Sequence, residues 1–262
     1  MKKEIRIDHL IISNMVNIGS RVLDVGCANG SLLHLLKKEK KVSGQGIEIN
    51  HNKVEKCLEK GLSVVEGDAN EEIKNFPKHA FDYVILSQTL QTVQKPRWVL
   101  TEILRVGKKA IISFPNFGHW VCRYQLCVHG KMPVTEDLKL MWYDTQNIHL
   151  CTVKDFYNLI NNMNFSIIEK RGIDRRKKII ERFNYSLLNI FASHVVFLIE
   201  TKTGEKQSLN LPVQPLSLLK AEIPNELLIR SEKEVIRIQI EPLKILERNA
   251  KFEFEFGDEK MF

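Results

Sequence analysis

The stretch VLDVGCANG, residues 22–30, decides the fold of this chain. It begins inside a short apolar run, residues 20–25, and is followed by residues 31–38, where leucines recur at helical spacing behind Ser31. This pattern predicts a strand, a glycine-containing turn and a helix. Glycines in such a turn let the backbone approach a ligand closely, and the first turn of the helix offers unpaired N–H groups. The stretch therefore predicts a nucleotide-type pocket.

The same residues separate two kinds of nucleotide pocket. A dinucleotide site shows G-x-G-x-x-G, which brings a pyrophosphate onto the helix N-terminus. Here Ala28 replaces the second glycine of that pattern, and Asp24 precedes Gly26. A carboxylate at this place repels phosphate and attracts an ammonium group. The expected ligand is cationic at one end and not phosphorylated.

Outward from this turn the chain alternates strand-like and helix-like segments, which is typical of a parallel sheet wrapped by helices. We predict an α/β fold with a doubly wound, seven-stranded, Rossmann-like sheet. Its expected strands are residues 20–25, 42–49, 62–66, 81–87, 109–114, 165–169 and 195–201, and its expected helices are residues 31–38, 52–60, 96–105 and 153–163.

The 262 residues exceed one average domain and fall short of two. We expect a main domain over residues 1–201 and a small, β-containing C-terminal appendage over residues 202–262, where prolines and alternating runs such as 235–239 and 252–256 begin. Residues 117–147 are rich in aromatic residues and methionine and interrupt the alternation. We interpret them as a lid inserted over the ligand site.

Two further carboxylates stand where such a pocket needs them. Glu48 ends the second strand, 22 residues after Gly26, near the spacing at which an acid accepts hydrogen bonds from ribose hydroxyls. Asp68 follows the third strand, where it can meet an adenine amino group. A single acid at a strand end is more often a helix cap or a solvated residue. Together with Asp24, at three successive strand ends, they predict an adenosine-containing ligand.

These motifs resemble those of class I S-adenosylmethionine-dependent methyltransferases. The resemblance implies that the first loop surrounds the methionine part of S-adenosyl-L-methionine, or of S-adenosyl-L-homocysteine, while Glu48 binds the ribose and Asp68 the adenine. Ala28 departs from the more usual glycine. The expected cofactor-binding residues are Asp24, Gly26, Cys27, Gly30, Glu48, Asp68, Ala69, Ser87 and Gln88.

A closer resemblance, over residues 15–200, is to the MetW family of methionine-biosynthesis proteins. It rests on the stretches FDYVILSQTLQ (81–91), SFPNFGHW (113–120), MPVT (132–135), WYDT (142–145) and NIHLCT (147–152). The resemblance implies a methyltransferase-fold protein that supports homoserine O-acyltransferase as a partner subunit. The alternative is an active methyltransferase on an unidentified small-molecule acceptor.

Catalytic residues are not evident from the sequence. A sulfonium methyl group is already electrophilic, so a base is needed only if the acceptor loses a proton. His119 and His149 are the candidates for such a base, with a packing role as the alternative for each. The fourth strand ends in Ser87-Gln88-Thr89 rather than Asn/Asp-Pro-Pro-aromatic, which argues against methylation of DNA bases or glutamine.

Aromatic side chains gather in the lid segment, at Phe117, Trp120, Trp142 and Tyr143. Three roles remain open for this cluster. It can pack the underside of the lid, stack on a substrate, or dock a partner protein, for which polar neighbours such as Arg123 and Lys131 suit a rim.

Positive charge is concentrated in one run. The chain carries a net charge of +7, and residues 170–182 hold seven bases and two acids, a local net of +5. No aromatic residue and no recognition motif accompanies the run, so we interpret it as a solvated loop or a surface for an acidic partner. Binding to nucleic acid, which such a run could also serve, is disfavoured.

The remaining composition points to a cytoplasmic protein. The apolar stretch 187–199 is too short and too interrupted to cross a bilayer, and Glu4 and Asp8 disrupt any secretion signal at the start. The five cysteines lack C-x-x-C spacing, so we expect neither a disulfide framework nor a metal site.

Overall fold

The computed structural model describes residues 6–202, 226–230 and 235–239. Internal contacts divide the chain into two units, Met1–Glu205 and Lys206–Phe262. The boundary that we expect at residue 202 stays a prediction, as does the covering role of the lid segment. None of the described helices combines the length and the hydropathy that a membrane crossing requires.

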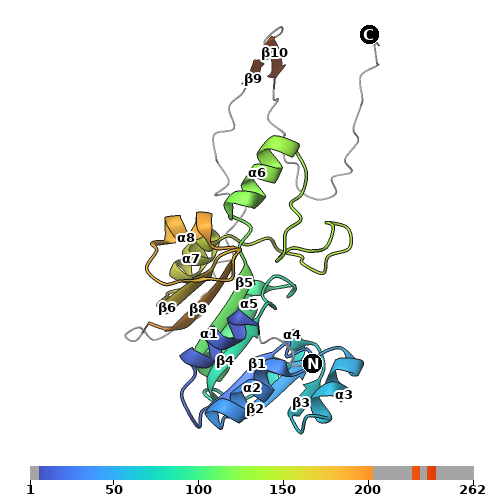
Figure 1. Ribbon diagram of the computed structural model, residues 1–262, viewed down its shortest axis with the longest axis vertical. Helices are drawn as coiled ribbons and strands as arrows, with labels where there is room; N and C mark the ends of the chain where they lie inside the picture. The colour runs from blue at the N-terminus through green and yellow to red at the C-terminus, as the bar shows by residue number, and fades with distance from the viewer. Residues whose placement is uncertain (1–5, 203–225, 231–234, 240–262) are drawn as a thin grey trace, which may run out of the picture. The chain divides into compact units, whose positions relative to one another are not determined.

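The first unit is built on one mixed sheet (Figure 1). Its strand order is β3-β2-β1-β4-β5-β8-β6-β7, parallel from β3 to β5 and antiparallel beyond. The α/β, doubly wound fold class is confirmed, but the described sheet has eight strands and not seven. The strands are β1 (Arg21–Val25), β2 (Ser43–Glu48), β3 (Ser63–Glu66), β4 (Phe81–Ser87), β5 (Gly107–Pro115), β6 (Phe165–Ile173), β7 (Ile179–Ile180) and β8 (His194–Thr201).

Helices cover both faces of this sheet. One apolar core joins one face to α1 (Ile7–Met15), α2 (Ser31–Lys40) and α3 (His51–Leu58). A second core joins the other face to α5 (Pro96–Val106), α7 (Val153–Asn162) and α8 (Tyr185–Phe191). Short turns α4 (Ala69–Glu72) and η1 (Ile73–Asn75) follow β3. Two layers of helices thus bury the strands and leave only the strand ends for ligands.

Local signals in the sequence explain where the helices begin and end. Pro96 occupies the first turn of α5, and Gly61, at φ 64°, closes the turn after α3. Thr152 caps α7, because its Oγ accepts the Asp155 N–H at 3.2 Å and donates to the Asp155 carboxylate at 2.6 Å. Thr152 thus satisfies one of the unpaired N–H groups in the first turn of α7. Helix α1 was not predicted.

The basic run, for which we expect a solvated loop or a surface for an acidic partner, is a loop only at residues 174–178 and 181–182. Its first four residues, 170–173, complete β6, and residues 179–180 form β7, so the run makes a β-hairpin at the sheet edge. Strand β6 carries two of the seven bases, Lys170 and Arg171, and the others lie in the hairpin turn or after β7.

The lid segment begins directly after β5. Helix α6 (Trp120–His129) projects beyond the end of the sheet (Figure 1), and Cys122 is its buried residue. Residues 130–152 contain no helix or strand. The two ends of the excursion meet where the Phe117 N–H donates to the Cys151 carbonyl at 3.0 Å. The segment is therefore tied at its base and exposed along its length.

The described part of the second unit is an antiparallel hairpin. Strand β10 (Val235–Gln239) pairs with β9 (Glu226–Arg230). The alternating run predicted at 235–239 is thus a strand, whereas the run at 252–256 lies outside the described residues.

Candidate functional site

The loop after β1 is held by hydrogen bonds to its neighbouring strand. The N–H groups of Gly26 and Cys27 donate to the Ile47 carbonyl at 2.8 and 3.0 Å, and the Gly30 N–H donates to the Cys27 carbonyl at 2.9 Å. Gly26 and Gly30 have φ of 76° and 68°, which side chains disfavour. Both predicted glycines are required by the shape of this loop.

The surroundings of these glycines also exclude a side chain. A Cβ on Gly26 would lie 2.7 Å from Thr89 Oγ1, and one on Gly30 would lie 2.5 Å from a Leu62 methyl carbon and 2.9 Å from Cys57 Sγ. All three distances are shorter than an ordinary van der Waals contact. The loop is therefore packed against α3 and the segment after β4.

Cys27 contributes packing rather than chemistry. Its side chain is buried 4.0 Å from Cys57 Sγ, and a Cβ on Gly46 would meet its sulfur at 2.5 Å. Burial raises the pKa of the Cys27 thiol, so the thiol stays protonated. Any contribution of Cys27 to a ligand comes from its backbone.

Asp24 is the most unusual group of this loop. It is 1% exposed at the end of β1, and its Oδ1 has no hydrogen-bond partner among the described residues. Burial raises the pKa of Asp24 to about 7; Arg6 opposes this shift, and the Glu48 charge adds to it. A buried carboxylate oxygen without a donor is suited to receive a ligand ammonium group.

Glu48 ties the ends of β1 and β2 together. One carboxylate oxygen accepts the Ala28 N–H at 2.8 Å, and the other accepts the Asn50 N–H at 3.0 Å. Ala28 itself has φ 49°, a conformation that glycine adopts more readily. The departure from glycine at position 28 therefore adds strain to the loop.

Asp68 lies after β3 as expected, in an exposed position. Its Oδ1 accepts the Asn70 N–H at 2.9 Å, which makes it the N-cap of α4, and Ala69 begins that helix. The helix-cap role weighed from the sequence is thus present. The side chain remains exposed at the carboxyl edge of the sheet, so an adenine contact stays a prediction.

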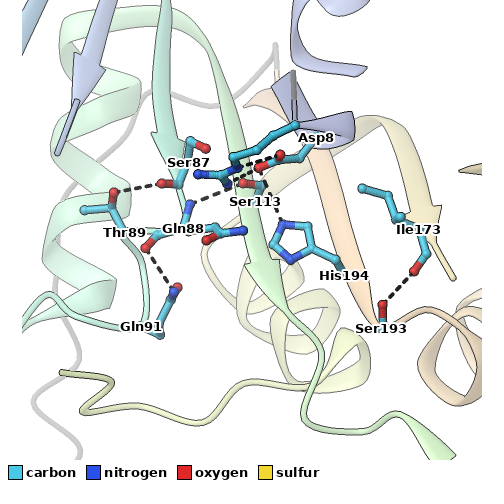
Figure 2. A network of polar contacts seen from close by, with 10 residues as sticks. Asp8, Ser87, Gln88, Thr89, Gln91, Ser113, Ile173, Ser193 and His194 are labelled. Atoms are coloured by element: carbon cyan, nitrogen blue, oxygen red, sulfur yellow. Dashed lines mark hydrogen bonds and ion pairs between the residues drawn. The ribbon is translucent and has the colours of Figure 1, made fainter. Parts of the chain in front are cut away.

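Ser87 and Gln88 close the set at the end of β4 (Figure 2). The Gln88 N–H donates to the Ser113 carbonyl at 2.9 Å and approaches its Oγ at 3.2 Å, while Gln88 has φ 56°. The buried Ser87 Oγ has no partner among the described residues. All nine predicted cofactor residues therefore stand at or just beyond the carboxyl ends of four adjacent strands, β3, β2, β1 and β4.

A buried ion-pair cluster beside these strand ends was not predicted. Asp8 in α1 is 4% exposed and accepts from Arg6 through both carboxylate oxygens, with Nε at 3.0 Å from Oδ1. Burial alone would raise the pKa of Asp8, but the Arg6 guanidinium outweighs burial and holds it below its usual range. His194 Nε2 lies 3.9 Å from Asp8 Oδ2 (Figure 2).

His194 has no hydrogen-bond partner for either ring nitrogen among the described residues, although it is only 3% exposed. Burial lowers its pKa; the Asp8 and Asp137 charges oppose this shift and Arg6 reinforces it. The sequence offered one weak signal for this cluster, the 7, 11, 12, 15 apolar spacing of α1, and none for His194.

Strand register places four polar residues on one face of the sheet. Asp24 pairs with Ile85, two residues before Ser87; Ser87 pairs with Ser113; and Pro115, two residues later, pairs with His194. Because alternate residues share a face, Asp24, Ser87, Ser113 and His194 form one row across the carboxyl edge, on the α1 side. We call these four residues the polar row.

The two candidate bases lie outside this row. His119 is 3% exposed and caps α6, because its Nδ1 accepts the Val121 N–H at 3.2 Å. The neutral ring then carries its proton on Nε2 and presents a donor. Burial lowers the pKa of His119, and Arg175 adds to the effect. His149 is exposed, and its backbone N–H donates to the Gln91 carbonyl at 3.0 Å. A role as base stays a prediction for both.

Comparison with known proteins identifies the family. The family "Methionine biosynthesis protein MetW" matches residues 6–199. A "Bifunctional methionine biosynthesis protein MetXA/MetW" of Rhodopirellula baltica is 33% identical over 175 residues, which are 63% of this chain and 28% of that protein. The chain thus spans little more than a quarter of the length of that relative.

Solved structures agree on the fold. A possible histamine N-methyltransferase of Thermotoga maritima superposes with a TM-score of 0.54 at 15% identity, over 74% of this chain and 87% of that one. A phosphoethanolamine N-methyltransferase of Haemonchus contortus, in complex with S-adenosyl-L-methionine, superposes with a TM-score of 0.55 at 18% identity, over 74% of this chain and 52% of that one. The sheet is that of S-adenosylmethionine-dependent methyltransferases.

Proposed function

Because the chain belongs to the MetW family of methionine-biosynthesis proteins, we propose that it binds S-adenosyl-L-methionine, or S-adenosyl-L-homocysteine, and supports homoserine O-acyltransferase as a partner subunit. The cofactor half of this proposal rests on one observation above all, the unpartnered Oδ1 of the buried Asp24. The partner half rests on the relative that carries the names MetXA and MetW in one chain.

The donor set at the strand ends suits this cofactor. Asp24 would receive its ammonium group, the loop from Gly26 to Gly30 would enclose the methionine part, and Glu48 and Asp68 would face the ribose and adenine. S-adenosyl-L-methionine supplies an electrophilic methyl group when bound. Each carboxylate oxygen can accept two hydrogen bonds, so Glu48 could accept from a ribose hydroxyl while it keeps the Ala28 N–H.

A docking surface for the partner is available on the lid segment. Trp142 and Tyr143 are 69% and 66% exposed, and they border a groove of about 1290 Å³ against α6. Aromatic residues with a polar rim are typical of the centre of protein interfaces. We call this surface the lid face; it consists of Trp120, Tyr124, Val128, Met132, Met141, Trp142 and Tyr143.

Calorimetric titration with S-adenosyl-L-methionine and S-adenosyl-L-homocysteine, alone and with the acyltransferase, tests the cofactor. We expect saturable binding and a melting temperature that rises with ligand concentration. Unchanged melting at millimolar concentrations of either ligand would contradict the cofactor half of the proposal and leave the partner half standing.

Co-purification with homoserine O-acyltransferase, and the activity of that enzyme with and without this chain, tests the partner. The variant Val128→Glu adds a charge to the lid face at the end of α6, and Leu58→Glu is its matched control at the end of α3, with similar exposure of 59% and 57%. We expect Val128→Glu alone to abolish the complex. Equal loss in both variants, or no complex with the native chain, would overturn this half.

The alternative, an active methyltransferase on a small-molecule acceptor, is favoured by one observation. His194 is buried, unpartnered and beside Asp8 at the end of the polar row, where a group that takes a proton would be useful. A screen of acceptors with a labelled methyl donor would have to show turnover that disappears in Asp24→Ala. Turnover that survives this change would assign the activity to a contaminant.

A further inference from the structure

A cavity of about 670 Å³ opens beyond the far end of the polar row. It lies between the start of α6, the β6–β7 hairpin and α8. His119 and Trp120 line one wall, Arg175 and Arg176 another, and Phe183 and Phe191 a third. This volume is typical of pockets that bind small molecules.

The register of the sheet places the cavity next to His194. In β8, His194 pairs with Pro115 of β5 on one side and with Ile173 of β6 on the other. The chain continues from Pro115 to His119 and from Ile173 to Arg175, so two walls of the cavity extend the two strands that flank His194. The negative charge of Asp137 acts on both His119 and His194, in agreement with this placement.

The walls offer donors for an anion. The ion pairs of the hairpin are made by Arg171, to Glu169 at 2.8 Å and Glu181 at 3.6 Å. Arg175 and Arg176 form no ion pair within the part of the chain that the structure describes. His119, which is 97% buried, adds Nε2–H, because its Nδ1 already accepts the Val121 N–H. Two guanidinium groups and one ring N–H match a carboxylate.

The rest of the lining is apolar or already engaged. Phe183 and Phe191 meet edge to face at 6.0 Å between ring centroids, and Ile180 and Trp120 extend this surface. Of the two acids in the lining, Asp174 accepts the Lys178 N–H at 2.7 Å and shapes the hairpin turn, while Glu136 is exposed on the lid segment. The arginines and the phenylalanines thus stand on different walls of one cavity, and Trp120 adds apolar surface to the wall of His119.

We propose that this cavity binds a small carboxylate that carries an apolar chain. Its place beyond His194 makes it the site of a second ligand beside the proposed cofactor, and this second role rests on the proposed function. The carboxylate would contact Arg175, Arg176 and His119, and the chain would lie against the phenylalanines.

A titration with hexanoate, monitored through the indole NMR signal of Trp120, tests the site. The controls are 1-hexanol and hexylammonium, which have a chain of the same length but no carboxylate. We expect hexanoate to bind at least tenfold more tightly than either. Arg175→Gln should lower the affinity for hexanoate about tenfold. Lys178→Gln removes the same charge from the same hairpin outside the cavity and should leave this affinity unchanged. Phe183→Ala should weaken hexanoate and hexanol alike.

Equal affinity for the three probes, or equal losses in Arg175→Gln and Lys178→Gln, would overturn the proposal, because either result indicates general attraction to a basic hairpin. The titration is repeated with saturating S-adenosyl-L-homocysteine. Hexanoate binding without any binding of S-adenosyl-L-homocysteine would support the carboxylate site and contradict the proposed cofactor. Absence of hexanoate binding would contradict the carboxylate site alone.

Discussion

The loop after β1 and the lid segment after β5 stand at the carboxyl edge of one sheet, with β4 between the two strands, and are built in opposite ways. The loop is closed by main-chain hydrogen bonds, has no room for a side chain at Gly26 or Gly30, and leaves one carboxylate oxygen unpartnered. The lid segment has large apolar side chains in solvent along α6 and residues 130–150.

This difference separates two kinds of recognition. A rigid loop with a fixed polar atom suits a small ligand of one shape, because its groups need no rearrangement on binding. An exposed apolar surface that is tied only at its base suits a large partner, which gains affinity from buried area. The contrast predicts that changes in the loop affect folding and cofactor binding, and that changes on the lid face affect association alone.

The largest expected effect comes from Gly30→Ala. The new Cβ would overlap a Leu62 methyl carbon at 2.5 Å and Cys57 Sγ at 2.9 Å in a backbone conformation that alanine disfavours. We expect a loss of about 3 kcal/mol in the free energy of unfolding, measured by urea denaturation. In the lid segment, Gly130 also has a positive φ, 58°, but a Cβ there would meet no atom within 4 Å. We expect Gly130→Ala to lower the free energy of unfolding by only about 1 kcal/mol. Equal losses of stability in Gly30→Ala and Gly130→Ala would show that Leu62 and Cys57 move aside and relieve the overlap at Gly30.

Asn116→Ala should have the next largest effect, because the side chain of this residue ties the base of the lid segment to the end of α8. It is 2% exposed; its Nδ2 donates to the Asn189 and Ala192 carbonyls at 3.0 and 2.7 Å, and its Oδ1 accepts the Gly118 N–H at 3.0 Å. Leaving these groups unpaired should cost about 2 kcal/mol in urea denaturation.

The control for this change is Gln146→Ala, at an exposed position of the lid segment, which should alter stability by less than about 0.5 kcal/mol. If Asn116→Ala proves as mild as Gln146→Ala, the base of the lid segment is not fixed in the way that its hydrogen bonds indicate.

Asp24 gives the cofactor site a pH dependence. With a pKa of about 7, its ionised fraction rises from about one tenth at pH 6 to about nine tenths at pH 8. If the ionised form receives the ligand ammonium group, the affinity for S-adenosyl-L-homocysteine should rise about tenfold over this range, measured by calorimetry. Asp24→Asn should bind weakly and without this dependence.

The stability of the ligand-free protein provides an independent check. The folded-state pKa of Asp24 lies above the ordinary value of 3.8, so the folded state binds the proton more tightly than the unfolded state. Its contribution to stability is therefore full below pH 3.8 and is lost as pH rises towards 7. Asp24→Asn should remove this decline; an unchanged decline would assign it to other groups.

The loop after β1 was predicted well from the sequence because its conformation depends on residues that are close together in the chain. Apolar runs and glycines at turns act within a few residues, and they place the strands and helices to within a few positions. The acids at successive strand ends were found because parallel strands bring their carboxyl ends to one edge.

The remaining features depend on register and on contacts between distant segments. Asp8 and His194 are 186 positions apart, and only the pairing of β8 with β5 and the packing of α1 bring them together. The charge of the basic run masked the strands at 170–173 and 179–180, which the expectation of a solvated loop or a partner surface did not include. The cap formed by His119 Nδ1, which limits its use as a base, could not be read from residue type.

The smallest effect on stability should come from Trp142→Ala. Its indole is 69% exposed and contacts Tyr143 at 5.6 Å between ring centroids, so little apolar area is lost from the core. We expect a change of less than about 0.5 kcal/mol in the free energy of unfolding and unchanged affinity for S-adenosyl-L-homocysteine. Binding to the acyltransferase should fall at least tenfold, because exposed tryptophans at interface centres contribute strongly to affinity.

Trp98→Phe, in α5 away from the lid face, is the control. If Trp142→Ala leaves the complex intact while Val128→Glu breaks it, docking is confined to α6 and excludes residues 141–143.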